Sequence, residues 1–232
     1  MIERLLPSYV AGADTHVAEA PPGSLYPEEA RLVARSVDRR KHEFASVRVC
    51  ARRAMAALGL PPVPVLTGHR GMPLWPDGVI GSMTHCDGYR AAALARTSRA
   101  RAIGIDAEPN EPLPSDVYEI VSLPSERTRM PGTDGAGVHW DRLLFSAKES
   151  VFKTWFPLTR VELDFTEADI TFHRSSGTAT GGTFTAELLR TAPGMPASYE
   201  GNWLVAEGLA VTAIVLPADR GAAVPLRGGA AG

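Results

Sequence analysis

Two acidic side chains, Asp106 and Glu108, occupy alternate positions in the apolar stretch 102–108. In an extended strand, residues two apart share a face, so the two carboxylates would project side by side, opposite Ile103 and Ile105. Their repulsion would be relieved by a shared proton or by a cation, and oxygen ligands without His or Cys select Mg²⁺ or a similar hard ion. The commoner explanation of an isolated pair of this kind is two acids exposed to solvent at the end of a strand, with no metal site.

A second segment, residues 145–153, places Glu149 and Lys153 one helical turn apart. Such a pair is common on helix surfaces, where it contributes only ~0.2–0.5 kcal/mol. Phe145 and Phe152 flank this pair, however, so its face is not plainly a solvent face. Added to the acidic strand, a third carboxylate and a cation would complete a Mg²⁺–phosphate site. There Glu149 could take a proton and Lys153 could neutralise a leaving phosphate.

The elements that must position these residues follow from periodicity and turn residues. A strand at 79–85 precedes a turn at Asp87-Gly88 and a return strand at 89–95, which is so rich in alanine that a helix stays possible. Residues 109–138 hold five prolines and predict a long loop with one short helix. A helix then spans 139–156 and is expected to end at Pro157, and strands follow within 160–190 and 202–216.

A basic run lies earlier in the chain. Residues 31–53 contain eight lysines and arginines against two acids, and residues 42–58 show the apolar spacing of a helix that stops at Gly59. A solvated basic face is the commoner interpretation of such a run. A phosphate-binding site is the sharper one, because the charge is concentrated locally in a protein with a formal net charge of -2.

Composition excludes several classes of protein. With 232 residues, 44% hydrophobic and 22% charged, the chain can bury a core as one large or two small domains. Lys and Arg number 24 against 26 Asp and Glu, so no global basic field indicates nucleic-acid binding. The two cysteines cannot build a disulfide framework, and the P-loop, HExxH and CxxC motifs are absent. No apolar stretch reaches the ~20 residues of a membrane span, so we expect a soluble, cytoplasmic protein.

The order of elements predicts an α+β fold with two similar lobes, because strands come in runs rather than alternating with helices. Each half offers one amphipathic helix and then strands, and residues 80–96 and 202–216 both look like hairpins. The predicted boundaries are an N-terminal lobe at 1–108 and a C-terminal lobe at 109–220, followed by a disordered tail at 221–232.

Two segments together resemble the signature pair of the 4′-phosphopantetheinyl transferases. Gly104-Ile-Asp-Ala-Glu108 fits G-[IV]-D-x-E, and Phe145-Ser-Ala-Lys-Glu-Ser-Val-Phe-Lys153, 37 residues further on, fits F-[SC]-x-K-E-[SA]-x-[YFW]-K. Ser82-Met-Thr-His85 and Thr67-Gly-His-Arg-Gly-Met-Pro73 also resemble family segments that hold coenzyme A. The resemblance covers most of residues 35–170 and is to the Sfp-type, within it to the enterobactin-synthetase and actinobacterial enzymes.

The resemblance implies a pseudo-dimeric two-lobed fold and a holo-acyl-carrier-protein synthase activity. In that reaction 4′-phosphopantetheine passes from coenzyme A to a serine of an acyl or peptidyl carrier protein, and adenosine 3′,5′-bisphosphate is released. Mg²⁺, with Mn²⁺ as a substitute, would be held by Asp106, Glu108 and Glu149. Glu149, Lys153 and Asp106 would be the catalytic residues, with Lys153 on the pyrophosphate. The working form would be a monomer without nucleic-acid or membrane partners.

The same resemblance implies a coenzyme A site that draws on both lobes. Its contacts would be Arg40, Arg48, Thr67, Gly68, His69, Arg70, Thr84, His85, Asp106, Glu149 and Lys153. Two other classes stay open: a Mg²⁺-dependent nucleotide phosphohydrolase, and a coenzyme A-binding module without turnover. The presence of both Glu149 and Lys153 argues against the binding module, which would need neither.

Overall fold

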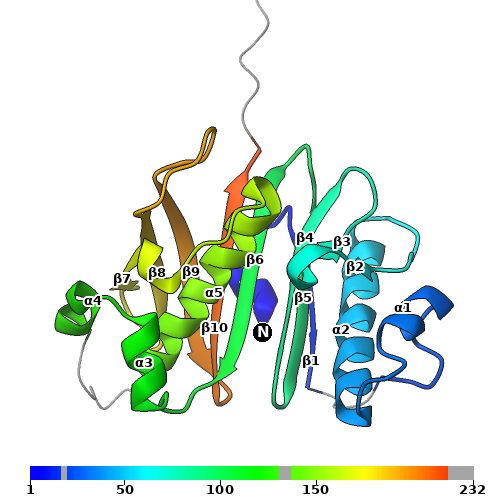
Figure 1. Cartoon of the computed structure of the whole chain (residues 1–232), viewed down its shortest axis with the longest axis horizontal. Helices are drawn as coiled ribbons and strands as arrows, with labels where there is room; N and C mark the ends of the chain where they lie inside the picture. Colours follow the sequence, from blue (N-terminus) through cyan, green and yellow to red (C-terminus); the bar gives the residue numbers. More distant parts are fainter. Residues whose placement is uncertain (17–19, 131–136, 219–232) are drawn as a thin grey trace, which may run out of the picture.

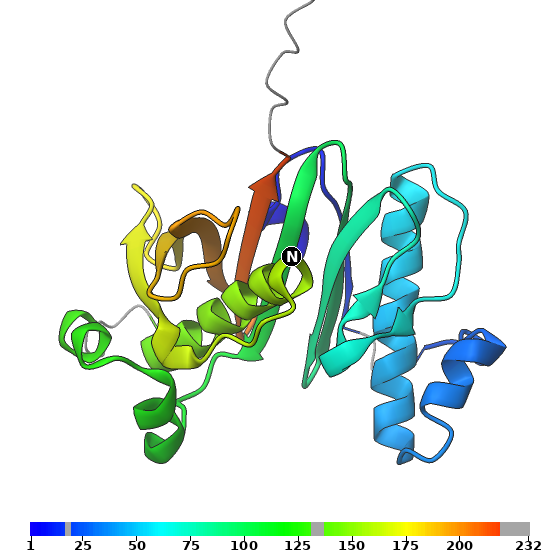
Figure 2. The same cartoon turned by 45° about the horizontal axis from the view of Figure 1, so that its top comes forward.

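The computed structural model describes residues 1–16, 20–130 and 137–218. These residues form two large antiparallel sheets that lie side by side, each covered on one face by a 20-residue helix (Figure 1), and a small two-stranded sheet. The predicted α+β class is confirmed. In a second view α2 stands beside the first sheet, and α5 lies across the second (Figure 2).

The first sheet has the strand order β1 (Ala11–Thr15), β5 (Tyr89–Arg96), β4 (Val79–Cys86), and helix α2 (Asp38–Ala57) packs on it. Strand β5 is buried along almost its whole length on both faces, between α2 and the second sheet. Alanine therefore fits there as a strand residue, because small side chains allow both neighbours to approach. The sequence had left a helix possible at this place.

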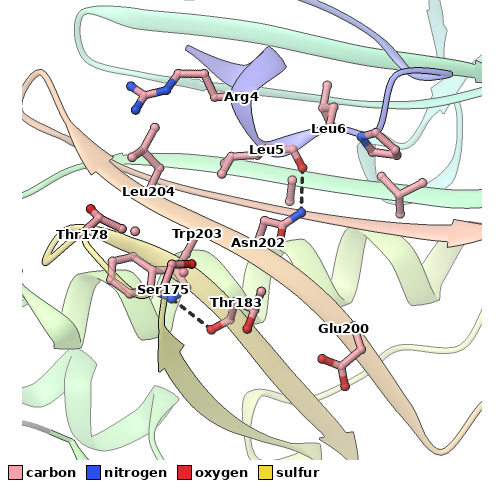
Figure 3. Close-up of a pocket in the computed structure, with 15 residues that line it drawn as sticks. Arg4, Leu5, Leu6, Ser175, Thr178, Thr183, Glu200, Asn202, Trp203 and Leu204 are labelled. Carbon is pink, nitrogen blue, oxygen red and sulfur yellow. Dashed lines mark hydrogen bonds between the residues drawn. The ribbon is translucent and has the colours of Figure 1, made fainter.

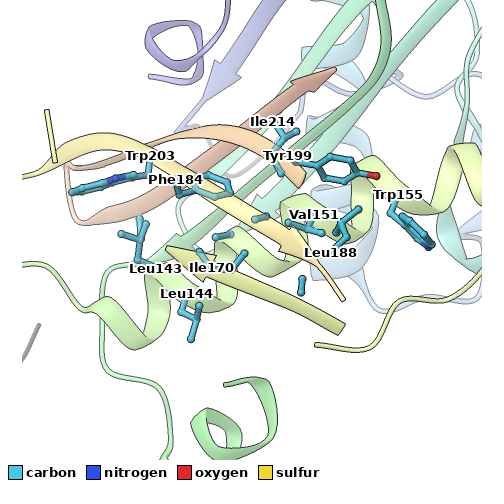
Figure 4. Packing of buried hydrophobic residues seen from close by; sticks show 14 of the residues in the cluster. Leu143, Leu144, Val151, Trp155, Ile170, Phe184, Leu188, Tyr199, Trp203 and Ile214 are labelled. Atoms are coloured by element: carbon cyan, nitrogen blue, oxygen red, sulfur yellow. The ribbon is translucent and has the colours of Figure 1, made fainter. Parts of the chain in front are cut away.

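The second sheet has the order β6 (Ala100–Pro109), β10 (Leu209–Pro217), β9 (Ser198–Ala206), β8 (Gly181–Leu188), β7 (Ala168–Arg174). Helix α5 (Trp140–Thr159) crosses one face, and Figure 4 shows the core between them. Side chains from α5 and from the strands interdigitate there, among them Leu143, Leu144, Val151, Trp155, Ile170, Phe184, Tyr199 and Ile214.

Shorter elements connect these units. They are η1 (Ile2–Leu5), α1 (Pro27–Leu32), β2 (Leu66–Thr67), η2 (His69–Gly71), β3 (Pro73–Leu74), α3 (Ser115–Val121), α4 (Pro124–Arg129) and η3 (Phe165–Glu167). The strands β2 and β3 pair with each other, and η1 packs between β1 and the second sheet.

Several boundaries differ from expectation. Helix α2 begins at Asp38, four residues before the predicted start, so part of the basic run lies on its first turn. Helix α5 continues past Pro157 to Thr159, because proline removes one amide donor without preventing a last turn, and Arg160 ends it at φ 59°. The segment 109–138 carries two short helices, α3 and α4, where one was expected. The predicted tail at 221–232 lies outside the described residues.

The edge strands β4 and β6 join the two sheets without a backbone ladder. The Ile105 amide donates to Ser82 Oγ at 3.1 Å, and the Ala107 amide donates to Thr84 Oγ1 at 3.2 Å. We call these contacts the hydroxyl seam. Strand β6 pairs with β10 along its length, so residues 100–108 belong to the second sheet by hydrogen bonding. The predicted boundary between the lobes, after residue 108, stays a prediction. The pairing of β6 with β10 would instead assign residues 100–108 to the C-terminal lobe.

Within the described residues, no helix combines the length and the apolar character that crossing a bilayer requires.

Candidate functional site

A close approach between β6 and α5 brings the two signature segments together. At Gly104 an added Cβ would lie 2.0 Å from the carbonyl oxygen of Ser150 and 2.3 Å from Thr154 Oγ1, so no side chain fits at this position. On the next residue of the same strand face, Asp106 reaches the helix at Lys153. The glycine of the first segment is therefore what allows the acid of that segment to meet the lysine of the second.

Asp106 is the centre of the site. Its side chain is buried, and Oδ1 accepts hydrogen bonds from Lys153 Nζ at 2.7 Å and from Thr84 Oγ1 at 3.0 Å. Its other oxygen, Oδ2, is buried and has no hydrogen-bond partner among the described residues. A buried carboxylate oxygen without a partner is costly, so this atom points to a ligand such as a cation.

The pKa values of the charged groups around Asp106 are shifted by burial and by one another. Burial raises the pKa of Glu149, opposed by the charge of Lys153 and helped by that of Asp106. Burial lowers the pKa of Lys153, but the Asp106 and Glu149 carboxylates outweigh it, and the net shift is upward. Burial, with the charge of Asp106, also raises the pKa of Glu108 to about 7, although Arg142 opposes this shift.

The carboxylates of Asp106, Glu108 and Glu149 are not grouped as a complete set of metal ligands. No three His, Cys, Asp or Glu side chains of the described ranges are grouped as a metal-binding cluster. Glu108 Oε2 accepts a hydrogen bond from Arg142 at 3.2 Å and is thereby engaged elsewhere. Asp106 Oδ2 and the Glu149 carboxylate remain available, and carboxylate oxygens are donors that suit Mg²⁺. The donor set therefore fits a divalent cation that takes its other ligands from a substrate.

A second cluster of charges lies at the amino end of α2. Arg40 is half-exposed, and its Nη1 lies 2.8 Å from His85 Nε2 at the end of β4. Glu43 lies between them, 3.8 Å from Arg40 and 3.6 Å from His85. Burial and the charge of Arg40 hold the pKa of His85 below its usual 6.5, with Glu43 opposing. This corner presents donors to an anion.

Arg48 is placed differently from Arg40. It is buried, and its guanidinium donates to the carbonyls of Val65 and Phe44 and to Thr67 Oγ1 at 2.9, 3.2 and 3.2 Å. Burial lowers its pKa to about 10. Arg48 thus supports the segment that carries Thr67, and its direct contact with a phosphate stays a prediction. Thr84 is likewise buried, with its hydroxyl already shared between Asp106 and Ala107.

The segment 68–70 contacts α5 near the carboxyl end of that helix. Gly68 lies so close to Leu74 that an added Cβ would be 2.8 Å from its Cδ2. The exposed His69 ring stacks on Phe156 of α5 with 6.0 Å between the ring centroids. Arg70, at φ 55°, lies 2.5 Å from a carboxylate oxygen of Glu162. These residues border the site, and their ligand contacts stay predictions.

Three adjoining cavities run along the predicted site residues. The first, 440 Å³, is lined by Arg40, Thr67 and His85 among others. The second, 220 Å³, shares Gly71, Pro73 and Met83 with it and reaches both charged residues of the α5 pair. The third, 240 Å³, continues from the second under α5. Together they form a row of cavities that leads from the Arg40–His85 corner past Lys153 and Glu149.

A larger cavity of 560 Å³ lies elsewhere, between η1 and strands β8–β10 (Figure 3). Two of its polar groups are used within the protein: Asn202 donates to the carbonyl of Leu5, and Trp203 donates to the carbonyl of Thr183. None of the predicted site residues lines it. Size therefore does not identify the site, whereas the convergence of charged groups does.

Several residues of the site were missed by sequence reasoning. Arg142 binds Glu108, and the buried Lys148 binds the buried Glu126 at 2.8 Å. In the first lobe the buried Glu29 binds Arg52 at 3.0 Å. The only sequence signal was that Lys148 stands inside the second signature segment.

Comparison with known proteins matches this chain over nearly its full length. It is 54% identical to the 4′-phosphopantetheinyl transferase Svp of Streptomyces mobaraensis, over 96% of this chain and 92% of that protein. The chain belongs to the 4′-phosphopantetheinyl transferase family. It is also 51% identical to PptT of Mycobacterium tuberculosis (84% of this chain, 88% of that protein) and 49% identical to Npt of Nocardia iowensis (92% and 99%).

Family descriptions agree with this membership. The 4′-phosphopantetheinyl transferase N-terminal domain matches residues 28–95, and the 4′-phosphopantetheinyl transferase superfamily domain matches residues 102–205. Similarity to enterobactin synthase component D is weaker, at 32% identity to the Salmonella typhi protein over 67% of this chain and 68% of that protein. The predicted resemblance, including its actinobacterial character, is confirmed.

Proposed function

We propose that this phosphopantetheinyl transferase moves 4′-phosphopantetheine from coenzyme A to a serine hydroxyl of an acyl or peptidyl carrier protein. Adenosine 3′,5′-bisphosphate is the other product. The observation that supports this most is the buried, unpartnered Oδ2 of Asp106. The other oxygen of this carboxylate binds Lys153, which lines the cavity that adjoins the one at the Arg40–His85 corner. Both halves of the site come from one chain, which supports a monomer as the working form.

Coenzyme A is the donor that this arrangement suits. Its phosphate groups need cations at two places, and the site offers Arg40 with His85 at one end and Lys153 at the other. Lys153 carries its charge at neutral pH, since the neighbouring carboxylates raise its pKa. We assign Lys153 to the pyrophosphate and the Arg40–His85 corner to the phosphate groups of the nucleotide end.

Mg²⁺ is the cofactor that the donor set suits, with Mn²⁺ as a substitute. Asp106 and Glu149 would hold it, and Glu108 would join them if it left Arg142. When bound, the ion neutralises pyrophosphate oxygens and so stabilises the charge that develops on the leaving group. Thr84 and Lys153 hold the Asp106 carboxylate in place from the Oδ1 side.

The chain's own residues supply the proton transfer. Glu149 accepts the proton of the carrier serine, since its carboxylate lines the cavities of the site and has no hydrogen-bond donor of its own among the described residues. The serine oxygen forms a bond to the β-phosphorus of coenzyme A, and the bond from that phosphorus to the bridging oxygen breaks. The electron pair leaves with the bisphosphate, whose developing charge Lys153 offsets.

Mass spectrometry of an apo-carrier protein, incubated with coenzyme A, Mg²⁺ and this protein, tests the proposal. The carrier should gain the mass of one phosphopantetheinyl group at its serine, and a serine-to-alanine carrier should gain nothing. Release of adenosine 3′,5′-bisphosphate without a modified carrier would instead show a nucleotide phosphohydrolase. Binding of coenzyme A with neither product would show a binding module.

A further inference from the structure

A buried ion pair made by Lys148, the residue before Glu149 on α5, is not explained by the reaction as described so far, although both residues line the 240 Å³ cavity. Lys148 Nζ lies 2.8 Å from Glu126 Oε2 and donates a hydrogen bond to the carbonyl of Phe165 at 2.7 Å. Both charged side chains are almost completely buried, 1% and 0% exposed. For a lysine so buried, losing its partner would leave an uncompensated charge in the interior.

Glu126 is held as firmly as Lys148. Its Oε1 accepts the amide of Ile170 on β7 at 2.8 Å, and its Oε2 accepts the amide of Leu123 at 2.7 Å. The carboxylate therefore ties the start of α4 to strand β7 and offers its remaining capacity to Lys148. Through this one group the position of α5 depends on α4 and on the edge strand of the second sheet.

The consequence for the site follows from helix geometry. Successive residues of an α-helix are about 100° apart, so a fixed direction for Lys148 also fixes the direction of the next residue, Glu149, and of Lys153 one turn later. Lys153 then meets Asp106, and Glu149 faces the cavities of the site. On the sheet side the helix is held by buried hydroxyl contacts, Ser150 with Thr212 at 2.7 Å among them.

We propose that Lys148, through its buried ion pair with Glu126, is a positioning residue that fixes the rotation of α5 and thereby the placement of Glu149 and Lys153. The inference rests on the proposed function, because it concerns the residues assigned there to the metal ion and the proton. It gives the first lysine of the second signature segment a role distinct from that of the last. Lys148 holds the helix, and Lys153 acts on the substrate.

The test compares Lys148→Met with Leu143→Ala. Leu143 is a fully buried core residue of the same helix, so its truncation lowers the melting temperature without touching the ion pair. We expect Lys148→Met to lower kcat per folded molecule roughly 10- to 100-fold, as misplaced catalytic groups do, with the KM for coenzyme A little changed. Leu143→Ala should leave kcat per folded molecule unchanged. Glu126→Gln, which keeps its shape, is the second variant if Lys148→Met does not fold.

A binding measurement separates this inference from the proposed function. Mn²⁺ is titrated calorimetrically into each variant in the presence of coenzyme A and without a carrier protein. Weaker Mn²⁺ binding in Lys148→Met and Glu126→Gln than in Leu143→Ala supports the positioning role. Equal Mn²⁺ affinity and equal kcat in the three variants overturn it. Failure of the wild-type protein to modify any carrier overturns the proposed function, while the Mn²⁺ titration still decides the role of Lys148.

Discussion

The two lobes use the same device to hold their long helices. In each lobe a six-residue helix begins with proline, and its third residue is a fully buried glutamate, Glu29 in α1 and Glu126 in α4. Each carboxylate accepts the amide of its own N-cap residue, Tyr26 or Leu123, at 2.9 and 2.7 Å. The similarity between the lobes therefore includes these buried glutamates, which the hairpin-like segments 80–96 and 202–216 did not predict.

Each carboxylate also reaches a distant amide and a cation. Val65 donates to Glu29, and Ile170 donates to Glu126, both at 2.8 Å. The cation comes from the long helix in both lobes, Arg52 from α2 and Lys148 from α5. This repeated device agrees with the predicted similarity of the lobes, although the pseudo-dimeric arrangement as a whole stays a prediction.

The difference between the lobes lies in what the helices present beside this anchor. Helix α2 presents Arg40 at a cavity, whereas α5 presents Glu149 and Lys153. In the proposed function, a common support thus carries the residues assigned to the nucleotide in one lobe and those assigned to the metal ion and the proton in the other. If this division is right, damage to the first lobe should appear in KM, and damage to the second should appear in kcat.

Removal of the divalent ion should have the largest effect on the rate of transfer. It should affect the step assigned to the second lobe and leave coenzyme A binding at the first lobe in place. EDTA should abolish transfer to the carrier, and Mg²⁺ or Mn²⁺ should restore it, because Asp106 and Glu149 need a hard divalent ion. Coenzyme A should still bind in EDTA through the Arg40–His85 corner, which calorimetry can measure. Undiminished transfer in EDTA would remove the metal from the mechanism.

Substitutions in the α5 pair should come next. Glu149→Gln and Lys153→Ala should each lower kcat by about 10²–10⁴-fold, because one removes the base and the other the charge beside the leaving group. Lys153→Arg should recover part of the loss, since its planar fork fits the site differently. Circular dichroism serves as the control for folding. Rates within a factor of two of the wild type would remove both residues from the catalytic machinery.

The two arginines of α2 should separate binding from support. Arg40→Ala should raise the KM for coenzyme A by roughly 10- to 100-fold, since a charged hydrogen bond to phosphate contributes ~1.5–3 kcal/mol. Its melting temperature should stay near that of the wild type, because Arg40 is half-exposed. Arg48→Ala should lower the melting temperature, because three acceptors lose their donor.

Dephospho-coenzyme A sharpens the comparison between these arginines. An arginine that holds the 3′-phosphate loses its advantage with this substrate, whereas one on the pyrophosphate keeps it. An unchanged KM in Arg40→Ala with both substrates would place that residue outside the site.

The smallest expected effect is a pH dependence of coenzyme A binding. Burial and Arg40 hold the pKa of His85 below 6.5 in the free protein, and a bound phosphate would raise it by favouring the imidazolium. Binding therefore takes up a proton between these two pKa values. Affinity should be highest below the free-state value and should fall a few-fold as the pH rises through this interval. His85→Gln should flatten this dependence, and an equal slope in both proteins would contradict it.

The sequence was most informative where chemistry depends on local spacing. Strand and helix periods pair Asp106 with Glu108 and Glu149 with Lys153 within their own segments, and the resemblance to the family's signature pair implies that the two segments meet. Arg48 could not be distinguished from Arg40 in the same way. Both are arginines of one basic helix, and only the chain at 65–67 decides that Arg48 is buried.

Other features depended on contacts between distant segments. The role of Thr84 follows from the meeting of β4 with β6, and that of Lys148 from the placement of α4 beside α5. Neither contact can be predicted from residue spacing within a single segment of the sequence. The two short helices in 109–138 were underestimated because five prolines there indicate turns, although Pro124 stands at the first position of α4, where proline favours a helix.

The hydroxyl seam determines how the two sheets can separate. In a backbone ladder, neighbouring hydrogen bonds share the same two strands and reinforce one another, and any residue type but proline can supply them. Here Ser82 and Thr84 supply the acceptors one side chain at a time. Ser82→Ala or Thr84→Val would each unbind a single β6 amide while both sheets keep their own pairing. The polar contacts between the sheets can therefore be removed one hydrogen bond at a time by mutation, while the apolar core that β5 shares with β6 and β10 stays in place.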